Sequence, residues 1–229
     1  MRVLNTSPRD LGFWIRSARS DSVLSRLRDQ HGSEKAFDLL YQLRRDPWGV
    51  EMCRRGYQSR KYDALMRTLP ERRYRRALDV GCGLGMLTRR LAARADEVLG
   101  VDLSRVAVQQ AQARSRGYAN VRHEQADLLA LDPSLNGLFD LVLAADTLYY
   151  ISPLTDDRLD RAVRRITRLL RPGGICLLAN HFFFRFDPDS RTTARIHSAF
   201  RRHQPLALLS ERRHAFFLAA VLEHRPPAA

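Results

Sequence analysis

The chain has 229 residues and a formal net charge of +14, from 39 basic and 25 acidic side chains. This length suits one domain with room for an appended segment. Hydrophobic residues at 45% and charged residues at 28% exclude a mainly disordered or collagen-like chain. No apolar run approaches the roughly 20 residues that span a bilayer. Residues 1–10 lack the apolar core of a secretion signal. We therefore expect a cytoplasmic protein without a membrane segment.

The basic excess lies at the two ends of the chain. Residues 1–76 hold 18 basic and 9 acidic side chains, residues 77–180 hold 13 and 12, and residues 181–229 hold 8 and 4. Lysine occurs only at Lys35 and Lys61, and codon bias of a GC-rich genome also produces such an arginine excess. The charge therefore favours an acidic or carrier-bound acceptor at most, and by itself does not indicate nucleic acid.

Residues 1–70 predict an N-terminal helical accessory segment, or lid. Apolar residues from Phe13 to Leu43 recur at helical spacing, and Asp46-Pro47-Trp48-Gly49 is a turn. A further helix is predicted from Tyr57 to Leu69, where Pro70 stops it.

Residues 71–229 show a different pattern, in which short apolar runs alternate with amphipathic stretches. Such alternation predicts an α/β fold with a mostly parallel sheet. Strands are predicted at 77–80, 97–101, 121–126, 139–144, 175–179, 206–209 and 215–222. Helices are predicted at 86–94, 105–116, 157–170 and 190–201.

The three cysteines, Cys53, Cys82 and Cys176, have no metal-ligand spacing, and three is an odd number for a disulfide framework. We interpret them as reduced thiols and expect no metal site.

The segment Leu78-Asp79-Val80-Gly81-Cys82-Gly83-Leu84-Gly85 carries the strongest functional signal. Glycines permit positive φ and let a ligand approach the backbone N–H groups, and the following helix N-terminus favours an anionic group. Met86 stands where a dinucleotide fingerprint has its third glycine, which argues against NAD. Asp102 ends the next strand, where a carboxylate can accept both hydroxyls of a ribose.

These residues resemble the first motifs of class I S-adenosylmethionine-dependent methyltransferases. The resemblance implies a Rossmann-like, doubly wound, seven-stranded sheet with an antiparallel strand near the C-terminus. It implies that the loop of Gly81, Cys82, Gly83 and Gly85 lines the methionine portion of S-adenosylmethionine. Asp79 would support the loop or the cofactor ammonium. The implied adenosine contacts are Asp102 with the ribose, Leu103 and Leu128 beside the adenine, and Asp127 with its amino group.

Three further segments, Asp46-Pro47-Trp48, Tyr57 with Arg60, and Leu148-Tyr149-Tyr150, resemble the nodulation protein S (NodS) family. Members of that family N-methylate the amino sugar of a chitooligosaccharide. The resemblance implies that Trp48, Tyr57 and Arg60 lie on a lid over the cofactor, where Arg60 can pair with its carboxylate.

Polar residues that follow the fourth and fifth predicted strands are candidates for acceptor chemistry. His181 is a candidate general base, or alternatively a structural histidine. Asp146 can bind an acceptor N–H or hydroxyl, or cap a helix, and Tyr149 can flank cofactor or acceptor. The phenylalanines that follow form either an apolar acceptor wall or core packing; they are Phe182, Phe183, Phe184 and Phe186.

The sequence thus predicts an S-adenosylmethionine-dependent N- or O-methyltransferase that acts on a small molecule such as an aminosugar or other natural product. An Asn/Asp-Pro-Pro-aromatic motif, which holds a flipped base, is absent after the fourth strand. The alternatives are an RNA methyltransferase that uses the basic flanks, and a non-catalytic cofactor-binding scaffold. We expect a monomer or a homodimer.

Overall fold

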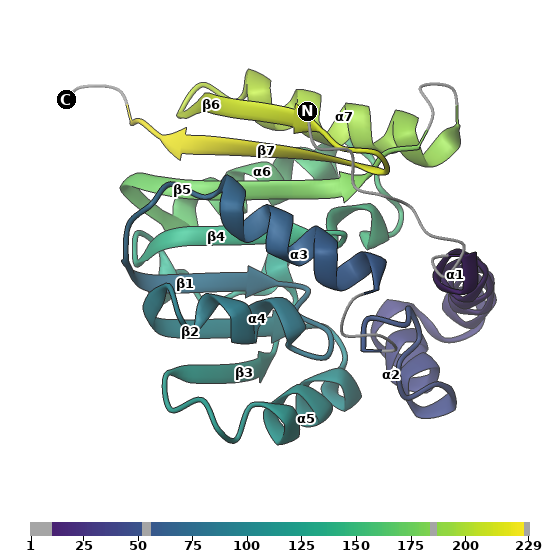
Figure 1. Ribbon diagram of the computed structural model, residues 1–229. Coiled ribbons are helices and arrows are strands. Elements are labelled where there is room, and N and C mark those ends of the chain that lie inside the picture. The colour runs from purple at the N-terminus through teal and green to yellow at the C-terminus, as the bar shows by residue number, and fades with distance from the viewer. Residues whose placement is uncertain (1–10, 52–55, 184–186, 227–229) are drawn as a thin grey trace.

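The computed structural model describes residues 11–51, 56–183 and 187–226. These residues form one seven-stranded sheet in the order β3-β2-β1-β4-β5-β7-β6 (Figure 1). The strands are β1 (Tyr74–Val80), β2 (Ala95–Asp102), β3 (Val121–Gln125), β4 (Phe139–Ala145), β5 (Leu170–His181), β6 (Leu206–Arg213) and β7 (Phe217–His224). Strands β1 to β5 pair in parallel and β7 pairs antiparallel to both neighbours, which confirms the predicted fold class.

Helices connect the strands in the predicted places. They are α1 (Leu11–His31), α2 (Ser33–Leu43), α3 (Tyr57–Thr68), α4 (Met86–Leu91), α5 (Arg105–Arg114), α6 (Asp156–Leu169) and α7 (Pro188–Arg202), with short 3-10 turns η2 (Leu128–Ala130), η3 (Pro133–Leu135) and η4 (Leu148–Tyr150).

The predicted boundaries differ from the structure mainly at the C-terminal strands. β5 is longer than predicted at both ends, because Leu170 pairs with Phe139 of β4 and His181 pairs with Phe217 of β7. β6 likewise continues to Arg213, since its pairing with β7 extends to that residue. These extensions come from partner strands, which a local sequence pattern does not reveal.

Both faces of the sheet are covered by helices. In Figure 1, α3 and α4 lie in front of the sheet and α6 lies behind it. Leu141 and Leu143 of β4 pack in the core under α3 and α4, whereas Val142 and Ala144 face the core under α6 and α7. All four side chains are fully buried. This arrangement explains why β4 reads as a continuous apolar run rather than an alternating one.

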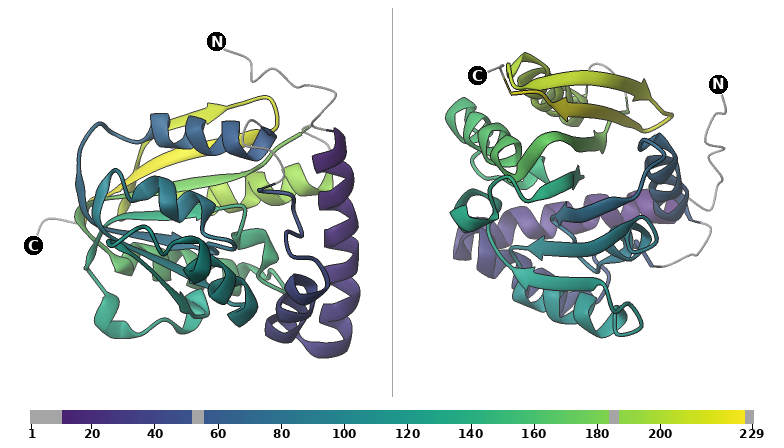
Figure 2. Two further views of the ribbon diagram at one scale, coloured as in Figure 1. Left: turned by 60° about the horizontal axis from the view of Figure 1, so that its bottom comes forward. Right: turned by 90° about the vertical axis from the view of Figure 1, so that its left-hand side faces the viewer.

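The first two helices lie beyond the carboxyl ends of the parallel strands, with α1 running along that end of the molecule (Figures 1 and 2). They have a small apolar core of their own, centred on Leu24, Ala36 and Leu40. Helix α3 differs, because its Leu65 is buried against the sheet. Residues 1–70 therefore include two kinds of packing: α1 and α2 lie over the strand ends, and α3 is part of the sheet's helical layer.

No helix in the described ranges is long and apolar enough to cross a membrane.

Helix α2 offers a test of how firmly the first two helices are held. Leu40 is fully buried and Leu43 is 68% exposed on the same helix. We expect Leu40→Ala to lower the free energy of unfolding by about 2–5 kcal/mol, because it leaves a cavity. Leu43→Ala, the matched control, is expected to change it by less than about 0.5 kcal/mol. Urea denaturation measures both, and equal effects would contradict the packing described here.

Candidate active site

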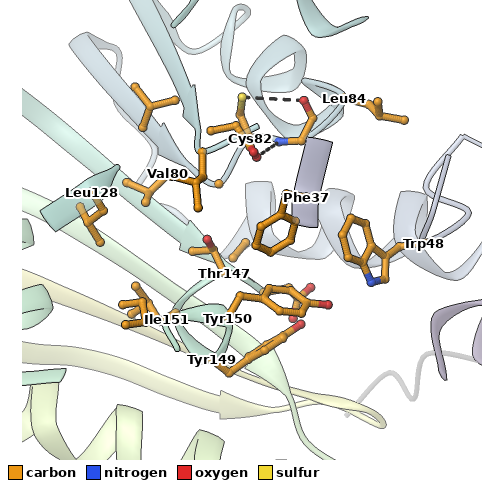
Figure 3. A pocket seen from close by; sticks show the side chains of 18 of the residues that line it. Phe37, Trp48, Val80, Cys82, Leu84, Leu128, Thr147, Tyr149, Tyr150 and Ile151 are labelled. Atoms are coloured by element: carbon orange, nitrogen blue, oxygen red, sulfur yellow. Dashed lines mark hydrogen bonds between the residues drawn. The ribbon is translucent and has the colours of Figure 1, made fainter. Parts of the chain in front are cut away.

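A cavity opens at the carboxyl ends of β1, β2 and β4, under α2 (Figure 3). Helices α2 and α3 and the turn after α2 supply Ser33, Phe37, Tyr41, Asp46, Pro47, Trp48, Val50, Gln58 and Tyr62. The strand ends and following loops supply residues 80–84, Met86, residues 101–103, residues 126–129, residues 145–152, Arg158 and His181. The location agrees with the general rule that ligands bind outside the carboxyl ends of such sheets.

The glycine loop after β1 fits closely against its neighbours. Gly81 has φ +70°, and a Cβ on it would lie 2.1 Å from Thr147 Oγ1. Gly85 also has positive φ and is the N-cap of α4, where a Cβ would lie 2.7 Å from His123 Cε1. Gly81, Cys82 and Gly83 line the cavity, whereas Gly85 packs behind the loop. Only glycine therefore fits at the two ends of the loop.

Asp102 joins the loop to the end of β2. Its Oδ2 accepts the backbone N–H of Gly83 at 2.8 Å, and its Oδ1 accepts that of Ser104 at 2.9 Å. Burial raises the pKa of Asp102 above its usual value. Each carboxylate oxygen retains a further lone pair, so Asp102 can accept two more hydrogen bonds from a ligand in the cavity. Leu103 lines the cavity beside it.

Asp79 does not line the cavity. It is buried on β1, accepts the Thr88 hydroxyl at 2.6 Å, and has its pKa raised to about 7 by burial. Because Thr88 belongs to α4, Asp79 ties the strand before the loop to the helix after it. Of the two implied roles for Asp79, the structure favours loop support.

Asp127 and Leu128 line the cavity beyond the end of β3. Asp127 Oδ1 also accepts the Leu129 backbone N–H at 2.9 Å and so caps η2. Its carboxylate thus combines the capping position with a place in the cavity wall.

Asp146, Tyr149 and His181 come together at the other side of the cavity. Tyr149 Oη lies 3.3 Å from His181 Nδ1, and Asp146 Oδ1 lies 3.8 Å from the same nitrogen. Burial lowers the pKa of His181 to about 4, so its ring is neutral at physiological pH. The pKa of Tyr149 is raised by burial and by Asp146, so its hydroxyl stays protonated. The site therefore pairs a neutral imidazole with a protonated phenol.

The three predicted lid residues have different positions. Trp48 lines the cavity, and its indole N–H donates to Asp21 Oδ1 at 3.1 Å. Tyr57 is 1% exposed and packs in the core against Phe13 and Phe216, with ring centroids 5.2 and 6.1 Å away. Arg60 is partly buried on α3 outside the cavity wall. Trp48 alone of the three is in the wall.

Other residues of the wall were not singled out from the sequence. Phe37 and Tyr41 of α2 pack with Trp48 and Tyr150, and the rings of Phe37, Trp48 and Tyr150 lie together in Figure 3. Tyr150 Oη donates to Asp21 Oδ1 at 2.8 Å, so one carboxylate oxygen of α1 holds both Trp48 and Tyr150. Helical spacing predicted buried faces for α1 and α2 but not what they face.

Lys61 is a further residue near the site that the sequence analysis did not identify. It is fully buried on α3 and forms an ion pair with Asp146 Oδ2. The sequence does contain a signal for this residue. Lys61 stands among the apolar positions of a predicted helix, in a chain with only one other lysine.

The remaining phenylalanine and cysteine residues named in the sequence analysis fall partly outside the described ranges. Phe184, Phe186 and Cys53 fall outside them. Phe183 stacks on His181 at 5.9 Å and contacts Phe216, so it is shared between the site and the core. Cys82 and Cys176 are buried free thiols, and the described ranges contain no group of three metal-ligating side chains.

Comparison with known proteins shows which proteins this chain resembles. Residues 77–174 match the family model described as a methyltransferase domain. With the glycine loop, Asp102 and the strand order, this match confirms the predicted resemblance to class I S-adenosylmethionine-dependent methyltransferases.

Individual methyltransferases are similar to this chain in sequence. Nodulation protein S of Azorhizobium caulinodans is 34% identical over 131 residues, which are 57% of this chain and 60% of that protein. The malonyl-[acyl-carrier protein] O-methyltransferase of Enterobacter lignolyticus is 40% identical over 118 residues, which are 52% of this chain and 43% of that protein. The chain thus spans about half the length of the curated relatives it matches.

Solved structures share the fold over a longer stretch. The N-methyltransferase NodS from Bradyrhizobium japonicum WM9, in complex with S-adenosyl-L-homocysteine, superposes with a TM-score of 0.68 at 17% identity. That match covers 92% of this chain and 99% of the other, so it extends into the helices before β1. The [4+2]-cyclase SpnF superposes with a TM-score of 0.62 at 21% identity. That match covers 73% of this chain and 81% of the cyclase. The predicted likeness to NodS is confirmed.

The contact between Gly81 and Thr147 gives a test with a matched control. Gly81 and Gly137 have nearly the same φ, +70° and +69°, but a Cβ on Gly137 would meet nothing within 4 Å. We expect Gly137→Ala to cost about 1–2 kcal/mol of stability through backbone strain alone. Gly81→Ala should cost about 1–3 kcal/mol more, because Thr147 must move. Chemical denaturation measures both, and equal losses would show that the contact is not tight.

Proposed function

We propose that this chain is an S-adenosylmethionine-dependent methyltransferase that acts on an amine or hydroxyl of a small molecule, such as an aminosugar or another natural product. One observation carries the proposal. A single cavity has the glycine loop and Asp102 on one side, and His181, Asp146 and Tyr149 on the other. The methyltransferase-domain match over residues 77–174, which include the glycine loop, Asp102, Asp146 and Tyr149, supports it.

The residues of the cavity fit the cofactor. Gly81 and Gly83 line the cavity, and the family resemblance implies that their backbone would contact the methionine portion. Asp102 has lone pairs available for two ribose hydroxyls. Leu103 and Leu128 would enclose the adenine and Asp127 would accept its amino group, as the family resemblance implies. Trp48 closes the cavity from the side of α2, where it excludes water.

The cofactor supplies an electrophilic sulfonium methyl group, so the protein's main task is to hold an acceptor atom in line with it. Asp146 and Tyr149 both face His181 Nδ1, which favours the tautomer with its proton on that nitrogen. Nε2 is then the basic nitrogen, and we assign it the removal of a proton from the acceptor. Asp146 and Tyr149 orient the ring.

Charge in this part of the cavity is balanced, which bears on the acceptor. Asp146 is compensated by Lys61 and His181 is neutral. An acceptor that enters as an uncharged amine or hydroxyl therefore leaves no unpaired charge. We further propose that α1 and α2 form the lid of a methyltransferase unit that begins near residue 71, with Asp21 holding Trp48 and Tyr150 in the closed arrangement.

A function without methyl transfer, such as that of a cofactor-binding scaffold, is the second candidate, and one observation favours keeping it. The cyclase SpnF has the same fold, so the fold does not by itself fix the reaction. Mass spectrometry of reactions with a panel of aminosugars, amines and phenols distinguishes the two, because transfer adds the mass of one methylene. An RNA substrate would instead show binding that weakens steeply with salt.

Cofactor binding is tested at Asp102. We expect Asp102→Ala to weaken binding of S-adenosylmethionine about 100-fold, because two hydrogen bonds to a charged acceptor are lost. Asp132→Ala is the control, since Asp132 likewise accepts a backbone N–H from two residues further on, that of Ser134, but lies outside the cavity. Isothermal calorimetry measures both. A wild-type protein that binds no S-adenosylmethionine would overturn the proposed function.

The role of His181 is tested by His181→Gln. We expect kcat to fall about 100-fold or more, while the KM for S-adenosylmethionine changes little. In the wild type, the base is active in its neutral form, which is present above its pKa of about 4. With a hydroxyl acceptor, which has no amine to protonate, activity should therefore persist below pH 6, where an ordinary histidine would be protonated. A loss of wild-type kcat centred near pH 6.5 would contradict this assignment.

A further inference from the structure

Lys61 is buried where a lysine is rarely found. Its side chain has no exposed surface, and its Nζ donates to Asp146 Oδ2. The same nitrogen lies 5.1 Å from the centre of the Phe217 ring. The pair joins α3 to the residue that follows β4, and it lies directly behind the cavity wall, to which Asp146 belongs.

The arrangement is not explained by stability alone. A buried ion pair is often no more stabilising than a well-packed apolar pair, because both charges must leave water. Asp146 also has a φ of 55°, the left-handed region that is costly for residues other than glycine. Buried charge combined with local strain is typical of functional sites.

The groups around Asp146 show what Lys61 contributes. The titratable side chains that face the Lys61–Asp146 pair are Tyr62 of α3, Tyr149 and Tyr150 of η4, His181 of β5, and His214 before β7. Burial raises the pKa of each tyrosine and lowers that of each histidine, so these groups are neutral. Within this set of described residues, Lys61 is the cation that balances Asp146.

The two oxygens of Asp146 have separate partners. Lys61 takes Oδ2, and Oδ1 lies 3.8 Å from His181 Nδ1. Without Lys61, a proton has to balance the buried carboxylate, and His181, 3.8 Å from Oδ1, is the nearest side chain besides Asp146 itself that can take it up. A protonated imidazole is no longer a base.

We propose that Lys61 is a positioning residue for the methyl-transfer site: by binding Asp146 Oδ2 it keeps the carboxylate charged and turned toward His181, and keeps His181 in its neutral form. The assignment of His181 as the base rests on the proposed function. The electrostatic interaction among Lys61, Asp146 and His181 does not depend on the proposed function.

The direction of the effect follows from the charges. The ammonium of Lys61 lowers the pKa of His181, and the carboxylate of Asp146 raises it. Removing the ammonium leaves only the carboxylate, so the pKa of His181 rises. Removing both charges takes away both influences, and the desolvated ring keeps a low pKa.

The experiment titrates the histidines by NMR, with the His181 signal identified by its loss in His181→Gln. We expect Lys61→Met to raise the pKa of His181 by about one unit or more. Lys61→Arg, which keeps the charge, should raise it much less. Lys35→Met is the matched control, because Lys35 is exposed on α2 and is the only other lysine; it should leave the pKa unchanged.

A second pair of variants avoids an unpaired buried carboxylate. In Asp146→Asn the ammonium still lowers the pKa of His181, whereas in Lys61→Met/Asp146→Asn it is gone. The pKa of His181 should therefore be higher in the double variant than in Asp146→Asn. This comparison decides the question if Lys61→Met does not fold.

Each result bears on one claim. If Lys61 only holds the fold together, Lys61→Met lowers the melting temperature and leaves the pKa of His181 where it was, which overturns the proposal. With an acceptor in hand, the acid limb of kcat against pH should move upward by the same amount as the pKa, with the KM for S-adenosylmethionine unchanged. The NMR titration needs no turnover, so failure to find methyl transfer would overturn the proposed function and leave this inference standing.

Discussion

The close contact of Gly81 with Thr147 is the constraint on which the rest of the site depends. Val80 of β1 and Ala144 of β4 are paired neighbours in the sheet, so the segments that leave these strands start side by side. They fit only because Gly81 has no Cβ. The cofactor loop is thereby fixed against the segment that carries Asp146 and Tyr149. The distance between the proposed cofactor and acceptor ends of the cavity is therefore set by the sheet.

Charge inside the cavity is handled locally, independently of the +14 excess. Asp102 is held by two backbone N–H groups, Asp127 caps η2, and Asp146 is balanced by Lys61. In the described part of the wall, Arg158 is the one arginine. Apart from Lys61 behind the wall, the lysines and arginines that the structure describes in the two flanks thus do not enter the proposed site. It remains available for an acidic acceptor or carrier at the surface, or reflects arginine-rich composition alone.

Local sequence signals predicted the sheet and the glycine loop after β1 well, for a physical reason. A parallel strand covered on both faces needs a continuous apolar run, and a loop with three positive-φ positions needs glycine, so residues 77–85 and 139–144 determine their own structure. The lid residues were different. Trp48, Tyr57 and Arg60 were grouped because of their resemblance to a family motif, yet Tyr57 lies in the sheet core between Phe13 and Phe216.

The sequence by itself determined the fold class, the position of the glycine loop and of Asp102, and the polar residues at the ends of β4 and β5. Each of these depends on contacts between residues close in the chain or on strand ends that a parallel sheet must bring together. The tertiary structure alone decided that Lys61 pairs with Asp146, 85 residues away, and that Asp21 holds Trp48 and Tyr150. Such pairings depend on how α1 and α3 dock on the sheet. The position of these helices on the sheet depends on the packing of many side chains together, so no local sequence pattern predicts it.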